Sequence, residues 1–196
     1  YEKNKPILKK LSFEARKGAM IAIVGPTGAG KTTLINLLMR FYDPDSGEVK
    51  LEGKNIADAN RLSVRRSYTM VLQDTWLFSG TIAENIAYGS SREVSRDEII
   101  SAAKSAGIHS FISALPNGYD TIITDEGVNI SKGQKQLLTI ARAMISDAPV
   151  LILDEATSNV DSMTEMRIQT AMSKLMAGRT SFVIAHRLST VRSADV

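Results

Sequence analysis

The sequence contains no cysteine, a single tryptophan and only 6% aromatic residues among its 196 positions. Without cysteine there is neither a disulfide framework nor a thiolate metal site, which suits a reducing compartment. No run approaches the roughly 18 apolar residues that a membrane-spanning helix needs, and no signal peptide is visible. Neither sign of charge is in large excess, since 24 basic and 21 acidic residues give a net charge of +3. This balance of charge argues against nucleic acid as a partner. The hydrophobic content of 43% suffices for one domain with a hydrophobic core.

A phosphate-binding pattern, G-x-x-x-x-G-K-[ST], stands near the N-terminus. Its members are Gly25, Pro26, Thr27, Gly28, Ala29, Gly30, Lys31 and Thr32, with Thr33 directly behind. The apolar run at 20–24 predicts a buried strand before it, and apolar residues at helical spacing follow it. The glycines therefore lie between a strand end and a helix start, where unpaired N–H groups and the helix dipole favour an anion. We expect Lys31 to reach the β- and γ-phosphates and the Thr32 hydroxyl to bind Mg²⁺.

The rest of the pattern predicts an α/β fold with a mainly parallel sheet. Buried strands are expected at 68–72, 150–153 and 181–185, and a small antiparallel β layer is expected from 7–16 and 48–52. Capping boxes at 95–98 and 162–165 predict two helix starts, Ser131 predicts a third, and Gly107 and Gly178 predict helix ends. We expect a core of residues 1–74 and 148–196 and an inserted α-helical subdomain of residues 75–147.

Four of the predicted strands end in chemically unusual residues: Gly25, Gln73, the pair Asp154 and Glu155, and His186. The carboxyl ends of parallel strands lie on one edge of an open sheet, where ligands bind. Each residue alone has an ordinary explanation, because a lone histidine is more often structural and an Asp-Glu pair often starts a helix. Together, after a phosphate loop, they indicate a nucleotide site.

The chemistry of these side chains suggests a role for each. Asp154 suits the Mg²⁺ shell, opposite Thr32. Glu155 is the candidate general base for a water in line with the γ-phosphate. His186 is expected either to contact the γ-phosphate or to hold Glu155, and Gln73 to serve Mg²⁺ or the attacking water. Lys31 and Mg²⁺ would neutralise the charge that builds on the transferring phosphoryl group.

At this point the sequence resembles the ATP-binding cassette family, and in particular the P-loop NTPase domains of ABC exporters. Residues 25–32 resemble its Walker A motif, 150–155 its Walker B motif, Gln73 its Q-loop and His186 its switch histidine. Residues 130–134 are similar to the LSGGQ signature, 158–161 to the D-loop and 74–86 to the exporter subclass. Tyr1 falls where the family places an aromatic ring on adenine. At 124–127 the family's Glu-x-Gly is replaced by Asp125, Glu126 and Gly127.

The resemblance implies a head-to-tail dimer of nucleotide-binding domains that sandwiches two ATP molecules. Ser131, Gly133 and Gln134 of the signature and Asp161 of the D-loop would then contact nucleotide. It also implies a transmembrane domain absent from this chain, a place at the cytoplasmic face of the membrane, and a chain truncated at both ends. Closure of the dimer on ATP would drive export.

Lys132 departs from the family pattern, because it stands where the signature has its first glycine. A long cation there is expected to disturb the contact with the opposite nucleotide, which favours a heterodimer whose partner carries an intact signature. A homodimer that tolerates Lys132 is the alternative.

Two other classes of protein share parts of the pattern. A soluble ABC-type ATPase of DNA repair or the ribosome would be expected to show a coiled-coil insertion or tandem cassettes. A P-loop kinase or GTPase outside the family is opposed by the signature helix and by His186. The apolar stretch 76–86 favours the exporter, as a seat for a cytoplasmic helix of the membrane domain, although it also suits an ordinary helical core.

Overall fold

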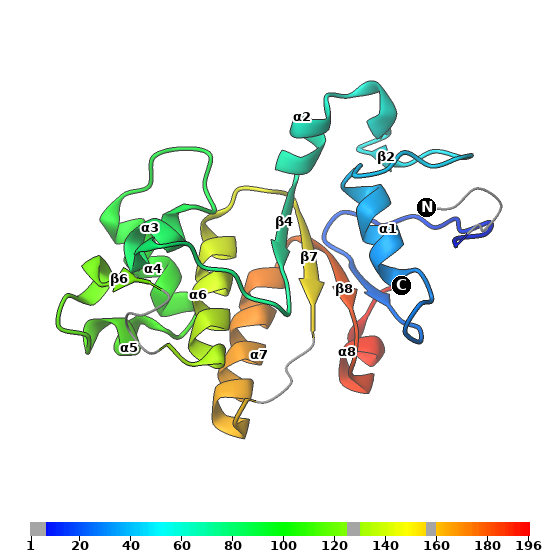
Figure 1. Ribbon diagram of the computed structural model, residues 1–196. Helices are drawn as coiled ribbons and strands as arrows, with labels where there is room; N and C mark the ends of the chain where they lie inside the picture. Colours follow the sequence, from blue (N-terminus) through cyan, green and yellow to red (C-terminus); the bar gives the residue numbers. More distant parts are fainter. Residues whose placement is uncertain (1–6, 125–129, 156–159) are drawn as a thin grey trace.

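A four-stranded parallel sheet forms the centre of the chain, of which this computed structural model describes residues 7–124, 130–155 and 160–196 (Figure 1). Its strands are β1 (Met20–Ile23), β4 (Tyr68–Val71), β7 (Val150–Asp154) and β8 (Thr180–Ile184), in the order β1-β8-β7-β4. All three neighbouring pairs are parallel. The predicted parallel sheet is confirmed, and the four strand ends lie on one edge.

Both faces of the central strands are covered, which explains why their sequences are continuously apolar. Leu151 and Leu153 of β7 face one apolar cluster, whereas Ile152, between them, faces another. The first cluster includes α6 (Lys132–Ile145) and α7 (Ser162–Met176), and the second includes α1 (Lys31–Leu38). The sheet is therefore a middle layer between two helical layers (Figure 1).

The remaining helices extend these layers. On the side of α6 lie α3 (Ile82–Ala87), α4 (Arg96–Ser105), α5 (His109–Ser113), the short turn η2 (Gly118–Asp120) and the two-stranded ribbon of β5 (Gly80–Thr81) and β6 (Ile122–Ile123). On the other side lie η1 (Ile56–Asp58) and α2 (Arg61–Arg66), and α8 (Leu188–Ser193) follows β8. One apolar cluster runs from α3 and α4 through α6 to β7. The domain boundaries at 74/75 and 147/148 stay a prediction.

The prediction that residues 48–52 pair with residues 7–16 is wrong. Residues 7–16 form no strand, and β2 (Lys50–Leu51) instead pairs with β3 (Lys54–Asn55), four residues along the chain. The turn between them consists of Glu52 and Gly53, both with positive φ (51° and 77°), as a two-residue type I′ hairpin requires. A local hairpin closes a far shorter loop than a pairing with 7–16 would. The small antiparallel layer exists, but it is this hairpin.

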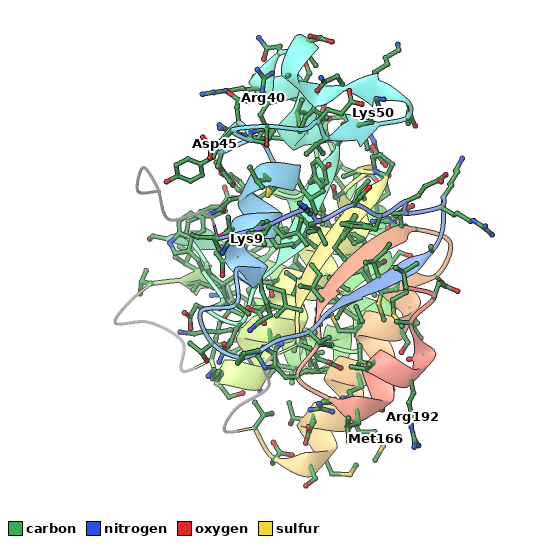
Figure 2. The ribbon with its side chains drawn as sticks, turned by 90° about the vertical axis from the view of Figure 1, so that its right-hand side faces the viewer. Lys9, Arg40, Asp45, Lys50, Met166 and Arg192 are labelled. Atoms are coloured by element: carbon green, nitrogen blue, oxygen red, sulfur yellow. The ribbon has the colours of Figure 1, made fainter. Side chains whose placement is uncertain are left out.

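Arg40, at the end of α1, connects that helix to the hairpin region. Its Nη1 donates to the carbonyls of Ile56 (2.8 Å) and Ala59 (2.5 Å), and its Nε donates to Asp43 (2.8 Å). Figure 2 shows Arg40 and Lys50 at one end of the molecule, opposite Met166 of α7 and Arg192 of α8. The hairpin therefore lies far from the start of α7.

Two of the three predicted helix-start signals, those at 95–98 and Ser131, are confirmed, and the third is wrong. Ser95 and Ser131 cap α4 and α6, each in a capping box with Glu98 and Gln134 respectively. The predicted box at 162–165 is wrong, because Asp161 caps α7 by accepting from the Thr164 N–H at 3.0 Å. Asp is as good a cap as Ser, so the helix begins with Ser162 as its first residue.

Candidate active site

The glycines of the phosphate loop adopt backbone conformations that other residues rarely adopt. Gly28 and Gly30 have φ of 83° and 94°, in the left-handed region. A Cβ on Gly30 would also come within 2.8 Å of Ile7 Cγ2 and 2.9 Å of Leu8 Cδ2. Gly30 is the residue that precedes α1, so its conformation fixes how the loop enters that helix.

The loop is open to solvent, as a site for a soluble anion must be. Its residues from Gly25 to Ala29 are all exposed, including Pro26, Thr27 and Gly28. Within it, the N–H of Ala29 donates to the Pro26 carbonyl at 3.1 Å, which closes a turn.

Lys31, the first residue of α1, bends back over the loop. Its Nζ donates to the carbonyls of Gly25 (2.7 Å) and Pro26 (3.1 Å). Thr32 is exposed beside it, and Thr33 is half-buried in the same turn. An ammonium group and an exposed hydroxyl therefore lie next to the loop, and their binding of phosphate and Mg²⁺ stays a prediction.

Asp154 and His186 meet at the end of the two central strands. Nε2 of His186 lies 3.5 Å from Oδ1 of Asp154, and their side chains are 49% and 24% exposed. The Asp154 Oδ1 atom is shielded from solvent and makes no hydrogen bond. A buried carboxylate oxygen without a donor is costly, and a cation would relieve that cost.

The oxygen atoms near this edge fit magnesium. Mg²⁺ prefers carboxylate, hydroxyl, amide and phosphate oxygens. Thr32 supplies a hydroxyl, Asp154 the unpartnered carboxylate oxygen, and Gln73, two residues beyond β4, an amide. No cluster of three or more His, Cys, Asp or Glu suited to a metal occurs in the described part of the chain. A metal here would therefore depend on oxygens of the bound nucleotide as well.

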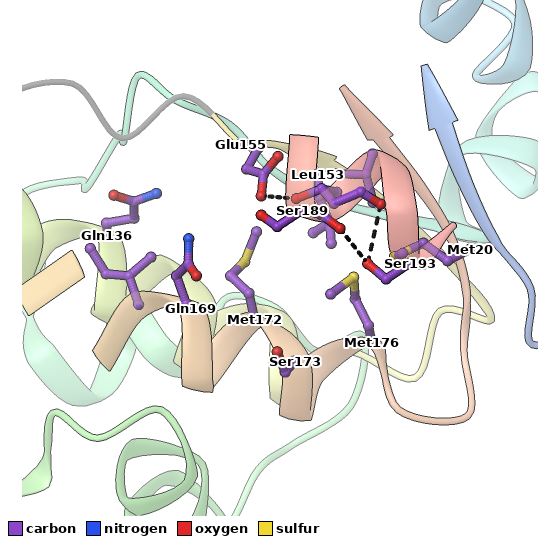
Figure 3. A pocket seen from close by; sticks show the side chains of 13 residues that line it. Met20, Gln136, Leu153, Glu155, Gln169, Met172, Ser173, Met176, Ser189 and Ser193 are labelled. Carbon is purple, nitrogen blue, oxygen red and sulfur yellow. Dashed lines mark hydrogen bonds between the residues drawn. The ribbon is translucent and has the colours of Figure 1, made fainter. Parts of the chain in front are cut away.

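Glu155 points toward α8 and lines a cavity of about 210 Å³ between α7 and α8 (Figure 3). Its Oε1 accepts a hydrogen bond from the Thr190 hydroxyl, drawn as the dashed line from Glu155 in Figure 3. Its Oε2 is shielded from solvent and has no hydrogen-bond partner. The predicted general base thus lies at the expected strand end, with its carboxylate turned into this cavity.

The signature residues form the N-terminus of α6. Ser131 and Gln134 cap the helix reciprocally: Ser131 Oγ accepts from the Gln134 N–H (3.2 Å), and Gln134 Oε1 accepts from the Ser131 N–H (2.9 Å). Lys132 is exposed on the first helical turn, whereas Gly133 is buried. A Cβ on Gly133 would lie 2.3 Å from Thr164 Cγ2. Within the chain, the glycine required by close packing is therefore Gly133, and position 132 is open.

Gly133 brings the signature against the start of α7. Val160 Cγ1 lies 3.2 Å from the position of a Gly133 Cβ, and Asp161 follows as the exposed cap of α7. Hydrogen bonds from Thr164 lower the pKa of Asp161, which keeps the cap ionised. The structure thus places the signature at 130–134 against Val160 and Thr164, which lie about 30 residues further along the chain.

Some predicted residues lie outside the described ranges. They are Tyr1, Asp125, Glu126, Gly127, Ser158 and Asn159.

Sequence reasoning missed the side chains that connect the site to its surroundings. Thr190 contacts Glu155, and Arg187 pairs with Glu165 of α7. Neither contact has a local signal, because the partners are 35 and 22 residues apart.

An aromatic cluster stands exposed beside α3. Trp76 and Tyr88 are 61% and 64% exposed, and both contact Phe78, with ring centroids 5.9 and 5.3 Å apart. Asn85, only 1% exposed, holds this loop by exchanging hydrogen bonds with the backbone of Phe78. Arg142 of α6 donates to Asn85 and to the Trp76 carbonyl. Arg142 lies 57 residues from Asn85 along the chain, so no local pattern signals this network.

Comparison with known proteins gives the same result as the geometry. The profile of the family described as ABC transporter matches residues 8–158. A fatty acid ABC transporter ATP-binding/permease protein of Mycobacterium bovis is 56% identical over 97% of this chain and 30% of its own length. An ATP-dependent lipid A-core flippase of Syntrophus aciditrophicus is 50% identical over 97% of this chain and 31% of its own length.

A solved structure agrees in fold as well as in sequence. A bacterial Atm1-family ABC exporter with ATP bound superposes with a TM-score of 0.88 and 45% identity, over 100% of this chain and 34% of that one. The chain thus spans about a third of the length of these relatives. In the described ranges, no helix is long and apolar enough to cross a bilayer. With the phosphate loop, the converging strand ends and the signature helix in place, the chain belongs to the ABC transporter family as one of its ATP-binding domains.

Proposed function

We propose that this domain hydrolyses ATP to drive an exporter, through residues at the carboxyl edge of its parallel sheet. The observation that carries the proposal is the convergence of four strand ends: the phosphate loop after β1, Gln73 after β4, Asp154 and Glu155 at the end of β7, and His186 after β8. Parallel strands bind ligands at this edge. Family membership supports ATP as that ligand.

Each side chain at this edge has a proposed role. The loop amides and Lys31 bind the phosphates, and nucleotide would replace the carbonyls of Gly25 and Pro26 as partners of the lysine ammonium. Glu155 accepts a proton from the attacking water. His186 contacts the γ-phosphate or holds Glu155. Such positioning supplies most of the catalysis in phosphoryl transfer.

Magnesium is the metal that the oxygen donors favour. Thr32, Asp154 and Gln73 would hold it, and it would neutralise charge on the phosphate oxygens. The Oδ1 atom of Asp154, which is shielded from solvent and accepts no hydrogen bond, supports this assignment.

A second nucleotide-binding domain is the proposed partner, in a head-to-tail dimer. Ser131 caps the 14-residue helix α6, and the exposed N-terminus of that helix would face the partner's γ-phosphate. Gly133, Gln134 and Asp161 would lie against the same nucleotide. ATP should raise the dimer fraction of a Glu155→Gln variant by mass action, which light scattering would measure.

Lys132 favours a heterodimer, because a lysine replaces glycine where the signature would meet the partner's nucleotide. Lys132 is exposed in this chain, which is also compatible with the homodimer. Co-purification of the full-length protein decides between them. A single-gene product that hydrolyses ATP at both sites would rule out the heterodimer.

The transmembrane partner would dock on the aromatic cluster of Trp76, Phe78 and Tyr88. Trp76 and Tyr88 of this cluster are exposed although they are aromatic, and Phe78 is half-buried; exposed apolar patches commonly mark interaction sites. The domain would then stand at the cytoplasmic face of the membrane. Tyr88→Ala should reduce coupling of ATP hydrolysis to transport without weakening ATP binding.

Two substitutions separate catalysis from binding. Glu155→Gln removes the general base, so hydrolysis should fall by roughly 10²- to 10⁴-fold while ATP affinity is kept. Lys31→Ala removes a phosphate ligand, so affinity itself should fall. Glu93→Gln, an exposed carboxylate remote from the strand ends, is the matched control. Turnover and nucleotide affinity are measured separately in the full-length protein. Unimpaired turnover in Glu155→Gln would refute the general-base role.

A further inference from the structure

Helix α8 is held in place by little apolar contact. None of its six residues is buried, and Leu188 and Val191 are 83% and 38% exposed. A helix this short has little stability of its own. Its position must therefore depend on polar contacts and on the backbone of the segments at its two ends.

Those polar contacts go to acidic residues of the site and of α7. His186 lies beside Asp154, Arg187 pairs with Glu165, and the Thr190 hydroxyl donates to Glu155. Beyond the helix, the Asp195 N–H donates to the Met20 carbonyl of β1 at 2.9 Å. Of these contacts, the one from Thr190 reaches the carboxylate proposed as the general base.

Glu155 has one carboxylate oxygen bonded within the domain and the other shielded from solvent. A general base must present an oxygen to the water that it deprotonates, within hydrogen-bond reach. Here Oε1 accepts a hydrogen bond from the Thr190 hydroxyl, and Oε2 is shielded from solvent without a hydrogen-bond partner. The carboxylate lies in the cavity between α7 and α8 (Figure 3), and we call this position the withdrawn state.

Two effects of opposite sign act on the withdrawn state. Burying Oε2 without a donor disfavours this state. The Thr190 hydrogen bond to Oε1 stabilises it. Because a cost and a gain of similar kind oppose each other, a single hydroxyl can shift the fraction of molecules in which Glu155 is available.

We propose that Thr190 is a positioning residue that holds Glu155 in the withdrawn state and so limits basal ATP hydrolysis. The inference rests on the proposed role of Glu155 as general base. Thr190 acts only through that carboxylate, so it should affect turnover and leave the binding of nucleotide by the phosphate loop unchanged.

Thr190→Val tests this, because it removes the hydroxyl and keeps the shape of the side chain. In the full-length protein at saturating MgATP, basal kcat should rise roughly 3- to 10-fold, the shift that one net hydrogen bond produces. KM for ATP should stay within about twofold of wild type if only the base is released. Thr190→Ser keeps the donor and should restore the wild-type rate.

Thr170→Val is the matched control, since it removes an exposed hydroxyl from α7 that bonds only to the Met166 carbonyl. It should leave both constants unchanged. Thermal melting verifies that each variant is folded, and Thr190→Ala replaces Thr190→Val if the latter is destabilised. Unchanged or lower kcat in the folded variant overturns the proposal.

The Glu155→Gln background separates this inference from the proposed function. If Thr190 acts through Glu155, Thr190→Val should have no effect on the residual rate there. A rate increase that persists in that background overturns the positioning role, even though Glu155 is the base. Wild-type turnover in Glu155→Gln alone overturns the general-base role instead.

Discussion

Replacing Gly133 with alanine should loosen the junction between the N-termini of α6 and α7. The added Cβ would lie 2.3 Å from Thr164 Cγ2 and 3.2 Å from Val160 Cγ1. Carbon atoms in contact prefer separations of about 3.5–4.0 Å, so α6 and α7 must move apart by about 1 Å or Thr164 must leave its rotamer. Threonine is stiff at χ1, which makes the second route costly.

The magnitude follows from two opposing effects. Overpacking of this kind typically costs about 1–3 kcal/mol. Alanine is a better helix former than glycine by up to about 1 kcal/mol. The net loss in the free energy of unfolding should be about 0.5–2 kcal/mol, and for a chain of this length the melting temperature should fall by about 1–8 °C.

Thermal and urea unfolding of four proteins test the reasoning: wild type, Gly133→Ala, Thr164→Ser and the double variant. Thr164→Ser removes the Cγ2 atom that would clash, so the double variant should recover most of the stability that Gly133→Ala loses. Lys132→Ala, on the exposed side of the same turn, should change stability by less than about 0.5 kcal/mol. Additive losses in the double variant would refute the assigned clash.

Two further predictions concern the side of the molecule that carries α4. Gly89→Ala would place a Cβ 2.0 Å from the backbone oxygen of Arg142, and no side-chain rotation can relieve this, so denaturation should show a loss of about 2 kcal/mol or more. Hydrogen bonds from Arg92 first, and then from Ser95, lower the pKa of Glu98 from 4.5 to about 2. The ionised Glu98 therefore stabilises the folded state above about pH 4.5, and this contribution is lost as the pH falls toward 2. Urea unfolding at several pH values should show that Glu98→Gln flattens this dependence, and equal slopes in both proteins would contradict it.

Much of the site could be predicted because its signals are short in sequence. The phosphate loop, the signature and the strand ends each occupy a few adjacent residues, and the parallel direction of the strands brings their carboxyl ends to one edge. The errors also arose locally. Asp161 replaced Ser162 as a cap of equal quality, and the turn at Glu52 and Gly53 closed a hairpin where a longer-range pairing was expected.

The sequence by itself therefore determined the four strands of the parallel sheet, the glycine-rich loop after the first of them and the residues that follow the strand ends, because apolar periodicity and turn chemistry are properties of neighbouring residues. Only the tertiary structure decided which way the side chains of that edge turn. Glu155 bonds to Thr190, 35 residues away, and Gly133 packs on Thr164 across two helices. Such contacts depend on how α6, α7 and α8 pack on the sheet, and no local pattern encodes the distance between two helices.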